Sequence, residues 1–160
     1  MPNGPDHIDL AIHNIEAADY LLAEPSFSDW AAVVVFYAAL HVVDAVFFCD
    51  PKAPKKHGIS HSERNDILKG TVHYQKIYEH YCIMSRVSHV ARYLQDRSTG
   101  RTVVFSTYMP TEVVRQQLVK HRLWQVIKSA ANFLPDKLAT KLTEKYRSSF
   151  DVSEGGPAPP

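Results

Sequence analysis

The sequence predicts an all-α protein, folded as an up-and-down bundle of four to six helices with a short third helix. Apolar residues recur at helical spacing through most of the chain, and the 20-residue run 30–49 is apolar on nearly every side. Segments rich in Pro, Gly and Ser separate these stretches. A chain of 160 residues suits one hydrophobic core, so we expect a single domain over residues 1–148 and a disordered tail over 149–160.

The first helix is expected over residues 6–24. Its apolar stripe consists of Ile8, Ile12, Ile15 and Leu22. Pro25 should end it, because the residue before a proline resists the α conformation. The second helix should follow an N-cap at Ser28 or Asp29 and run to Cys49. Because it is apolar all round, we expect it at the centre of the bundle.

A loop rich in Pro and Lys is expected over residues 50–58. Ser60 and Glu63 then form the capping-box pattern, which predicts a short third helix from about His61 to Gly70. A fourth helix is expected over residues 71–95, followed by an exposed loop over 96–107. Two final helices are expected over residues 110–134 and 135–147.

The composition excludes several functional classes. The 18 basic residues nearly balance the 17 acidic ones, so net charge alone gives no case for nucleic-acid or membrane binding. The apolar run 30–49 approaches the length of a membrane span, but it contains His41 and Asp44, and a buried core helix explains it better. The two cysteines and the polar start of the chain fit a reducing cytoplasm. The chain has no glycine-rich phosphate loop, CxxC pair or HExxH motif.

Polar residues interrupt the second helix at regular spacing. Tyr37, His41, Asp44 and Phe48 fall on one helical stripe, with His41 and Asp44 one turn apart. A neighbouring carboxylate can orient an imidazole and make it more basic. The alternative is structural: the His satisfies a buried Asp and fixes the packing.

A second polar group surrounds the start of the third helix. His57 precedes the helix, and His61, Arg64 and Asn65 stand on its opening turns. Donor side chains beside a helix N-terminus favour an anion such as phosphate, although a solvated polar first turn is equally compatible. The short connection 50–58 should bring this group near the second helix. The candidate catalytic residues are therefore His41, Asp44, His57, His61 and Arg64.

Further residues could complete a binding pocket. Either Arg86 or Arg92 on the fourth helix could contact a phosphate. The candidate substrate-binding residues are Tyr37, Asn65, Arg86, Arg92 and Tyr93. A metal site from His41, Asp44, His57 and His61 has suitable ligand types but no tight spacing. The prediction is therefore no metal and no cofactor, with a metal-binding bundle kept as an alternative.

Several of these residues form a pattern that resembles small bacterial proteins of the HEPN superfamily. The resemblance covers about residues 8–94. It consists of the helix order and of the run 29–45 with its Tyr-Ala-x-x-His, then His57, residues 61–65, Ser85, Arg86 and residues 91–93. The resemblance implies a bundle of four or five helices that often dimerises. It also implies metal-free RNA cleavage, binding of RNA or nucleotides, or partnership with a nucleotidyltransferase or an antitoxin in toxin and defence systems.

Active members of that superfamily carry an Arg followed after four to six residues by a His. Here such spacing occurs at Arg115 and His121, the alternative catalytic pair. Six residues along a straight helix turn by about 240°, so the two side chains should not share a face. The leading hypothesis is a homodimeric protein that binds RNA or a nucleotide. If it is an enzyme, we expect a metal-independent endoribonuclease of a toxin or defence system. The alternatives are a non-catalytic interaction module and a metal-binding bundle.

Overall fold

The structure is a computed structural model that describes residues 3–56, 59–94, 99–102 and 104–150. Within these residues the protein is all-α, 82% helical and without strands. It has seven helices rather than four to six, because a single helical turn, α5 (Phe105–Tyr108), forms in the predicted exposed loop. Phe105 is 3% exposed, and burial of this ring explains why the turn is ordered.

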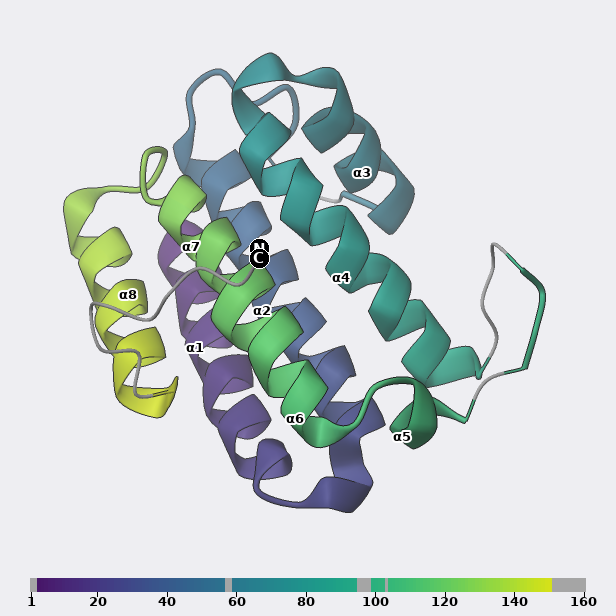
Figure 1. Cartoon of the computed structure of the whole chain (residues 1–160). Helices are drawn as coiled ribbons and strands as arrows, with labels where there is room; N and C mark the ends of the chain where they lie inside the picture. Colours follow the sequence, from purple (N-terminus) through teal and green to yellow (C-terminus); the bar gives the residue numbers. More distant parts are fainter. Residues whose placement is uncertain (1–2, 57–58, 95–98, 103, 151–160) are drawn as a thin grey trace.

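The first two helices, α1 (Gly4–Leu22) and α2 (Ser28–Cys49), pack closely against each other (Figure 1). Asn3 caps α1 in a capping box with Asp6. Gly4 permits the close approach of the helix ends, since a Cβ added there would lie 2.7 Å from Cys49 Sγ. The predicted cap of α2 is wrong: Phe27 occupies the N-cap position and Ser28 is the first helical residue.

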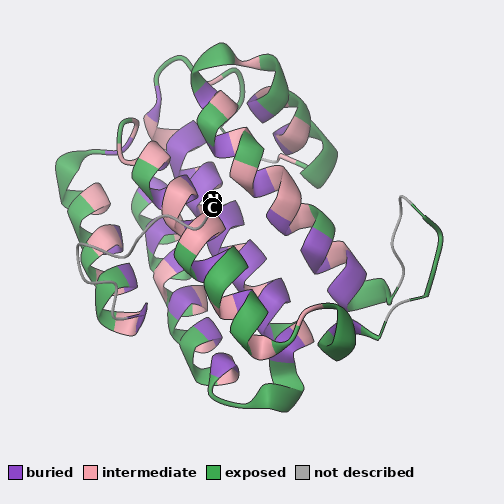
Figure 2. Cartoon of the chain, viewed as in Figure 1, coloured by how far each residue is buried: buried purple, intermediate pink, exposed green. Residues whose placement is uncertain are grey.

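Helix α2 is the central helix, as its apolar surface predicts. It contacts α1, α4 and α7, and most of its length is buried (Figure 2). Between Ala31 and Cys49, partial exposure follows one helical stripe that ends at Cys49. The other members of this stripe are Val34, Tyr37, His41, Asp44 and Phe48. We call these five residues the open stripe of α2.

The short third helix, α3 (His61–Gly70), begins at the predicted capping box: Ser60 Oγ accepts from Glu63 N, and Glu63 accepts from Ser60 N. A 3₁₀ turn (Val72–Tyr74) precedes α4 (Gln75–Tyr93), so the fourth helix starts later than expected. Asp50 connects this turn to the end of α2, because its carboxylate accepts a 2.6 Å hydrogen bond from the Tyr74 hydroxyl.

The predicted helix after Pro110 consists of α6 (Thr111–Val113), a π-helical stretch (Val114–Leu123) and α7 (Trp124–Ala130). The last helix, α8 (Asp136–Phe150), packs against α1 on the opposite side of the bundle from α3 (Figure 1). It extends to Phe150, which is 4% exposed, so the helix ends later than the expected end at residue 147. The rest of the predicted tail lies outside the described residues.

The stretch Pro25–Cys49 is long and apolar enough, by length and composition, to cross a membrane. In this fold 67% of its most apolar window is buried inside the bundle. Such burial is typical of a core helix. The expectation that the protein does not bind a membrane stays a prediction.

Candidate functional site

The open stripe of α2 lies where α2, α1 and α3 come together. His41 and Asp44 are both half-buried on this stripe. α1 contributes His7 from one side, and α3 contributes Arg64 from the other. The sequence hypothesis placed His41, Asp44 and Arg64 near one another, and the structure brings them together.

Arg64 forms a bidentate ion pair with Asp44. Its Nε lies 2.7 Å from Asp44 Oδ1 and its Nη2 lies 3.0 Å from Asp44 Oδ2. Nη2 also donates to the backbone carbonyl of Ile59, at 3.2 Å. The arginine side chain is only 6% exposed. Arg64 therefore joins α3 to α2, and most of its donor capacity is used inside the protein.

This pairing changes the role that the sequence suggested for Arg64. A phosphate-binding arginine needs guanidinium donors that face solvent or substrate. Here the fork of donors faces Asp44, and leaving Asp44 without its partner would cost several kcal/mol, about 3–5 for a buried pair. Arg64 thus acts as a structural connection.

His7 was missed by the sequence analysis. Its Nδ1 lies 3.4 Å from Nδ1 of His41, and the two rings stack with centroids 5.6 Å apart. His7, His41 and Asp44 each have one potential metal-binding atom, and these three atoms lie within 4.8 Å of one another. His7 is 34 residues before His41, so spacing along the chain gave no signal. The signal lay in the tight pairing of α1 with α2.

Burial is the largest influence on His41. Together with the charge of His7 it lowers the pKa of His41 below its usual value, and the opposing effect of Asp44 is smaller. Asp44 does make His41 more basic, as the sequence interpretation expected, but burial and the charge of His7 outweigh this effect. Asp44 is already paired with Arg64, so little of its charge acts on the imidazole. The lowered pKa favours the neutral form of the His41 imidazole.

His61 lies exposed at the start of α3 and stacks on Phe36, with ring centroids 6.0 Å apart. Burial, followed by the charges of Arg64 and Arg92, lowers the pKa of His61. Although Arg92 belongs to α4, its charge therefore acts on the His61 ring at the start of α3. The Arg92 guanidinium lies 5.4 Å from the ring centroid of Tyr93, which is 61% exposed. We call His61, Arg92 and Tyr93 the α3–α4 face.

The other predicted site residues have different surroundings. Tyr37 is half-buried near Tyr81, whose pKa it helps to raise after the larger effect of burial. Asn65 Oδ1 is buried and has no hydrogen-bond partner among the described residues. Arg86 is exposed on α4. His57 lies outside the described residues.

The alternative catalytic pair is not assembled within one chain. The Nη2 of Arg115 donates to the carbonyl of Leu22 at the end of α1, at 3.2 Å. His121 instead packs against His80 of α4, with ring centroids 5.5 Å apart. The two residues sit at opposite ends of the π-helical stretch and face different helices.

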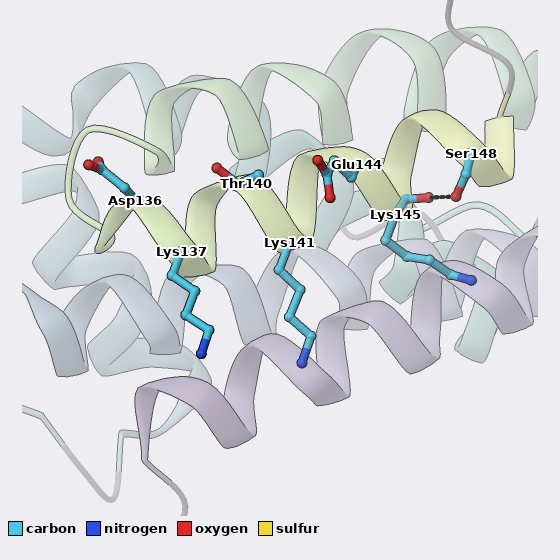
Figure 3. Close-up of a pocket in the computed structure, with 7 residues that line it drawn as sticks. All are labelled: Asp136, Lys137, Thr140, Lys141, Glu144, Lys145 and Ser148. Carbon is cyan, nitrogen blue, oxygen red and sulfur yellow. Dashed lines mark hydrogen bonds between the residues drawn. The ribbon is translucent and has the colours of Figure 1, made fainter.

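An open surface depression of about 670 Å³ lies along α8, away from these residues. Its lysines point toward α1 (Figure 3), where Lys141 pairs with Asp9 and Lys145 with Glu16. Two of the three lysines that line the depression are therefore paired with carboxylates of α1.

Comparison with protein-family models, curated proteins and solved structures found no match to this chain. Family membership is therefore not shown, and any function has to be argued from the geometry above.

Proposed function

We propose that this chain is an HEPN-like helical bundle that binds single-stranded RNA at its α3–α4 face. The observation that supports it is the meeting of three different groups: the fixed charge of Arg92, the exposed ring of Tyr93 and the imidazole of His61. Proteins that bind single-stranded nucleic acid combine cations for the backbone with aromatic rings on which bases stack.

Each group has a distinct part in this proposal. Arg92 contacts a phosphate through a charge-assisted hydrogen bond. Tyr93 offers an exposed ring to a base, and its contact with His89, at 4.6 Å between centroids, restrains the ring in place. His61, the first residue of α3, holds its ring in place by stacking on Phe36.

Binding is proposed rather than cleavage. Metal-free phosphodiester cleavage needs a cation that stabilises the transition-state phosphate, together with a base and an acid. Arg64, the cation that the sequence offered for this step, is held by Asp44. The α3–α4 face offers a cation and an exposed aromatic ring for binding, but it does not combine the cation, base and acid that cleavage needs.

Fluorescence anisotropy with a labelled single-stranded RNA tests the proposal. The wild type should bind and weaken as salt rises, because phosphate contacts release counterions. Arg92→Gln should weaken binding and reduce the log–log salt slope by about 0.7. Tyr93→Ala should lose roughly 1–3 kcal/mol of stacking free energy.

The control is Lys137→Gln on α8, an exposed cation on the other side of the bundle. It should bind RNA as the wild type does. The proposal fails if the wild type shows no salt-sensitive binding, or if Lys137→Gln weakens binding as much as Arg92→Gln does. Circular dichroism of each variant checks that the fold is kept.

A second candidate function is homodimerisation, and one observation favours it. The start of α2, the end of α4 and α5 meet at one end of the bundle (Figure 1). These segments carry large apolar side chains that are 43–59% exposed: Phe27, Trp30, Leu94 and Tyr108. Large exposed apolar side chains on neighbouring segments are typical of protein interfaces.

Sedimentation velocity tests this second candidate. The wild type should sediment as a dimer, and Trp30→Asp should shift it to monomer because a charge would enter the apolar contact. Leu10→Asp is the matched control, since Leu10 is 40% exposed but lies midway along α1. A wild type that stays monomeric at micromolar concentration contradicts the candidate.

A further inference from the structure

We infer that His7, His41 and Asp44 form a binding site for a divalent transition metal of the zinc class, at the junction of α1 and α2. This site is independent of the proposed RNA-binding face. The ligand atoms of the three side chains fall within 4.8 Å of one another, and all three residues are partly accessible.

The separation of the two imidazoles fits such an ion. Two nitrogens bound to one tetrahedral zinc at about 2.05 Å are separated by about 3.3 Å. The two Nδ1 atoms of His7 and His41 are 3.4 Å apart. Without an ion, one of the two Nδ1 atoms must carry a proton and donate it to the other. With an ion between them, both Nδ1 atoms are unprotonated and each binds the ion through its lone pair.

The chemical type of the ligands also suits a metal. A set of two imidazoles and one carboxylate favours borderline ions such as Zn²⁺ and Co²⁺ over Mg²⁺ and Ca²⁺. Three protein ligands leave a fourth position for water.

Arg64 is compatible with this arrangement. A carboxylate has about four lone-pair positions, and Arg64 uses one on each oxygen of Asp44. The bidentate pair fixes the carboxylate plane, which is how outer-shell partners orient metal ligands. Arg64 is therefore a positioning residue for Asp44 and does not itself touch the ion.

Isothermal titration calorimetry of the tag-free full chain with Zn²⁺ and with Co²⁺ tests the inference. We expect one equivalent to bind and Mg²⁺ to give no signal. His7→Gln and His41→Gln should each lower the Zn²⁺ affinity more than tenfold. His13→Gln is the matched control, because His13 is exposed on the same helix and outside the cluster, and its affinity should equal that of the wild type.

The visible spectrum of the Co²⁺-loaded protein gives a second readout. Ligation by nitrogen and oxygen should produce d–d absorption without a thiolate charge-transfer band. The inference is overturned if the wild type binds no stoichiometric Zn²⁺, if His7→Gln binds as tightly as the wild type, or if a thiolate band shows that cysteine holds the ion. His7→Gln keeps the test decisive even if His41→Gln fails to fold.

Discussion

At the scale of single residues, the competition for Asp44 determines how the polar cluster is arranged. His41 stands one turn away on the same helix, yet Asp44 pairs with Arg64 from α3. Arg64 provides a planar fork that matches both carboxylate oxygens and stays charged at every ordinary pH. A half-buried imidazole offers one donor and loses its charge easily, so it pairs with His7 instead.

This arrangement predicts how stability depends on pH. The pKa of His41 is lower in the folded protein than the ordinary value of 6.5, so below pH 6.5 the unfolded chain binds more protons than the folded one. The stability contributed above pH 6.5 should be lost as the pH falls through the folded pKa. His61, His80 and His121 are shifted in the same direction.

Urea unfolding from about pH 8 to about pH 5 measures this effect. The wild type should lose stability over that range, and His41→Gln should show a smaller loss because glutamine does not titrate. His13→Gln should retain the wild-type slope. An unchanged slope in His41→Gln would contradict the assignment of the effect to this residue.

At the scale of elements, the capping box of α3 controls the position of two site residues. His61 and Arg64 both lie in the first turns after Ser60. Hydrogen bonds from Lys55 and from the Ser60 backbone lower the pKa of Glu63 to about 2, so the box remains intact at mildly acid pH. A weaker cap should therefore disturb both side chains together.

Ser60→Ala should lower the free energy of unfolding by about 1 kcal/mol, because the Glu63 N–H loses its acceptor. Hydrogen exchange should show the loss in α3 first. Ser62→Ala, an exposed serine outside the cap, is the control and should change stability by less than about 0.5 kcal/mol. Equal effects of the two substitutions would exclude the capping explanation.

The sequence predicted elements that have local signals and missed those that depend on distant contacts. Ser60 and Glu63 predicted the start of α3, and the apolar surface of the second helix predicted its central position. α5 was missed because the burial of Phe105 depends on tertiary packing. His7 was missed for the same reason, since its contact with His41 is created by the pairing of two helices.

At the scale of the whole molecule, α8 is attached to the bundle by two kinds of contact. Its apolar side chains Leu142, Tyr146 and Phe150 are buried, and the Tyr146 hydroxyl donates to the Val119 carbonyl in the π-helical stretch. Its ion pairs are exposed: Lys141 is 52% and Asp9 60% accessible. Exposed pairs contribute roughly 0–1 kcal/mol, so burial should dominate.

Two neighbouring positions separate these contributions. Leu142→Ala should lower the free energy of unfolding by about 2–5 kcal/mol, because it removes a fully buried side chain. Lys141→Ala should lower it by less than about 1 kcal/mol. Chemical denaturation measures both, and a larger loss in Lys141→Ala would mean that charge attaches α8.

Because Gly4 lies close to Cys49, the reactivity of the Cys49 thiol depends on whether the first turn of α1 is folded. Burial raises the pKa of the Cys49 thiol, and the first turn of α1 lies against its sulfur. Cys49 is partly accessible, and fraying of that turn should raise its alkylation rate further, whereas Cys82 on α4 is independent of the turn. The ratio of the two alkylation rates measures the opening of the turn that carries His7, and an ion that joins His7 to α2 should slow the labelling of Cys49 alone.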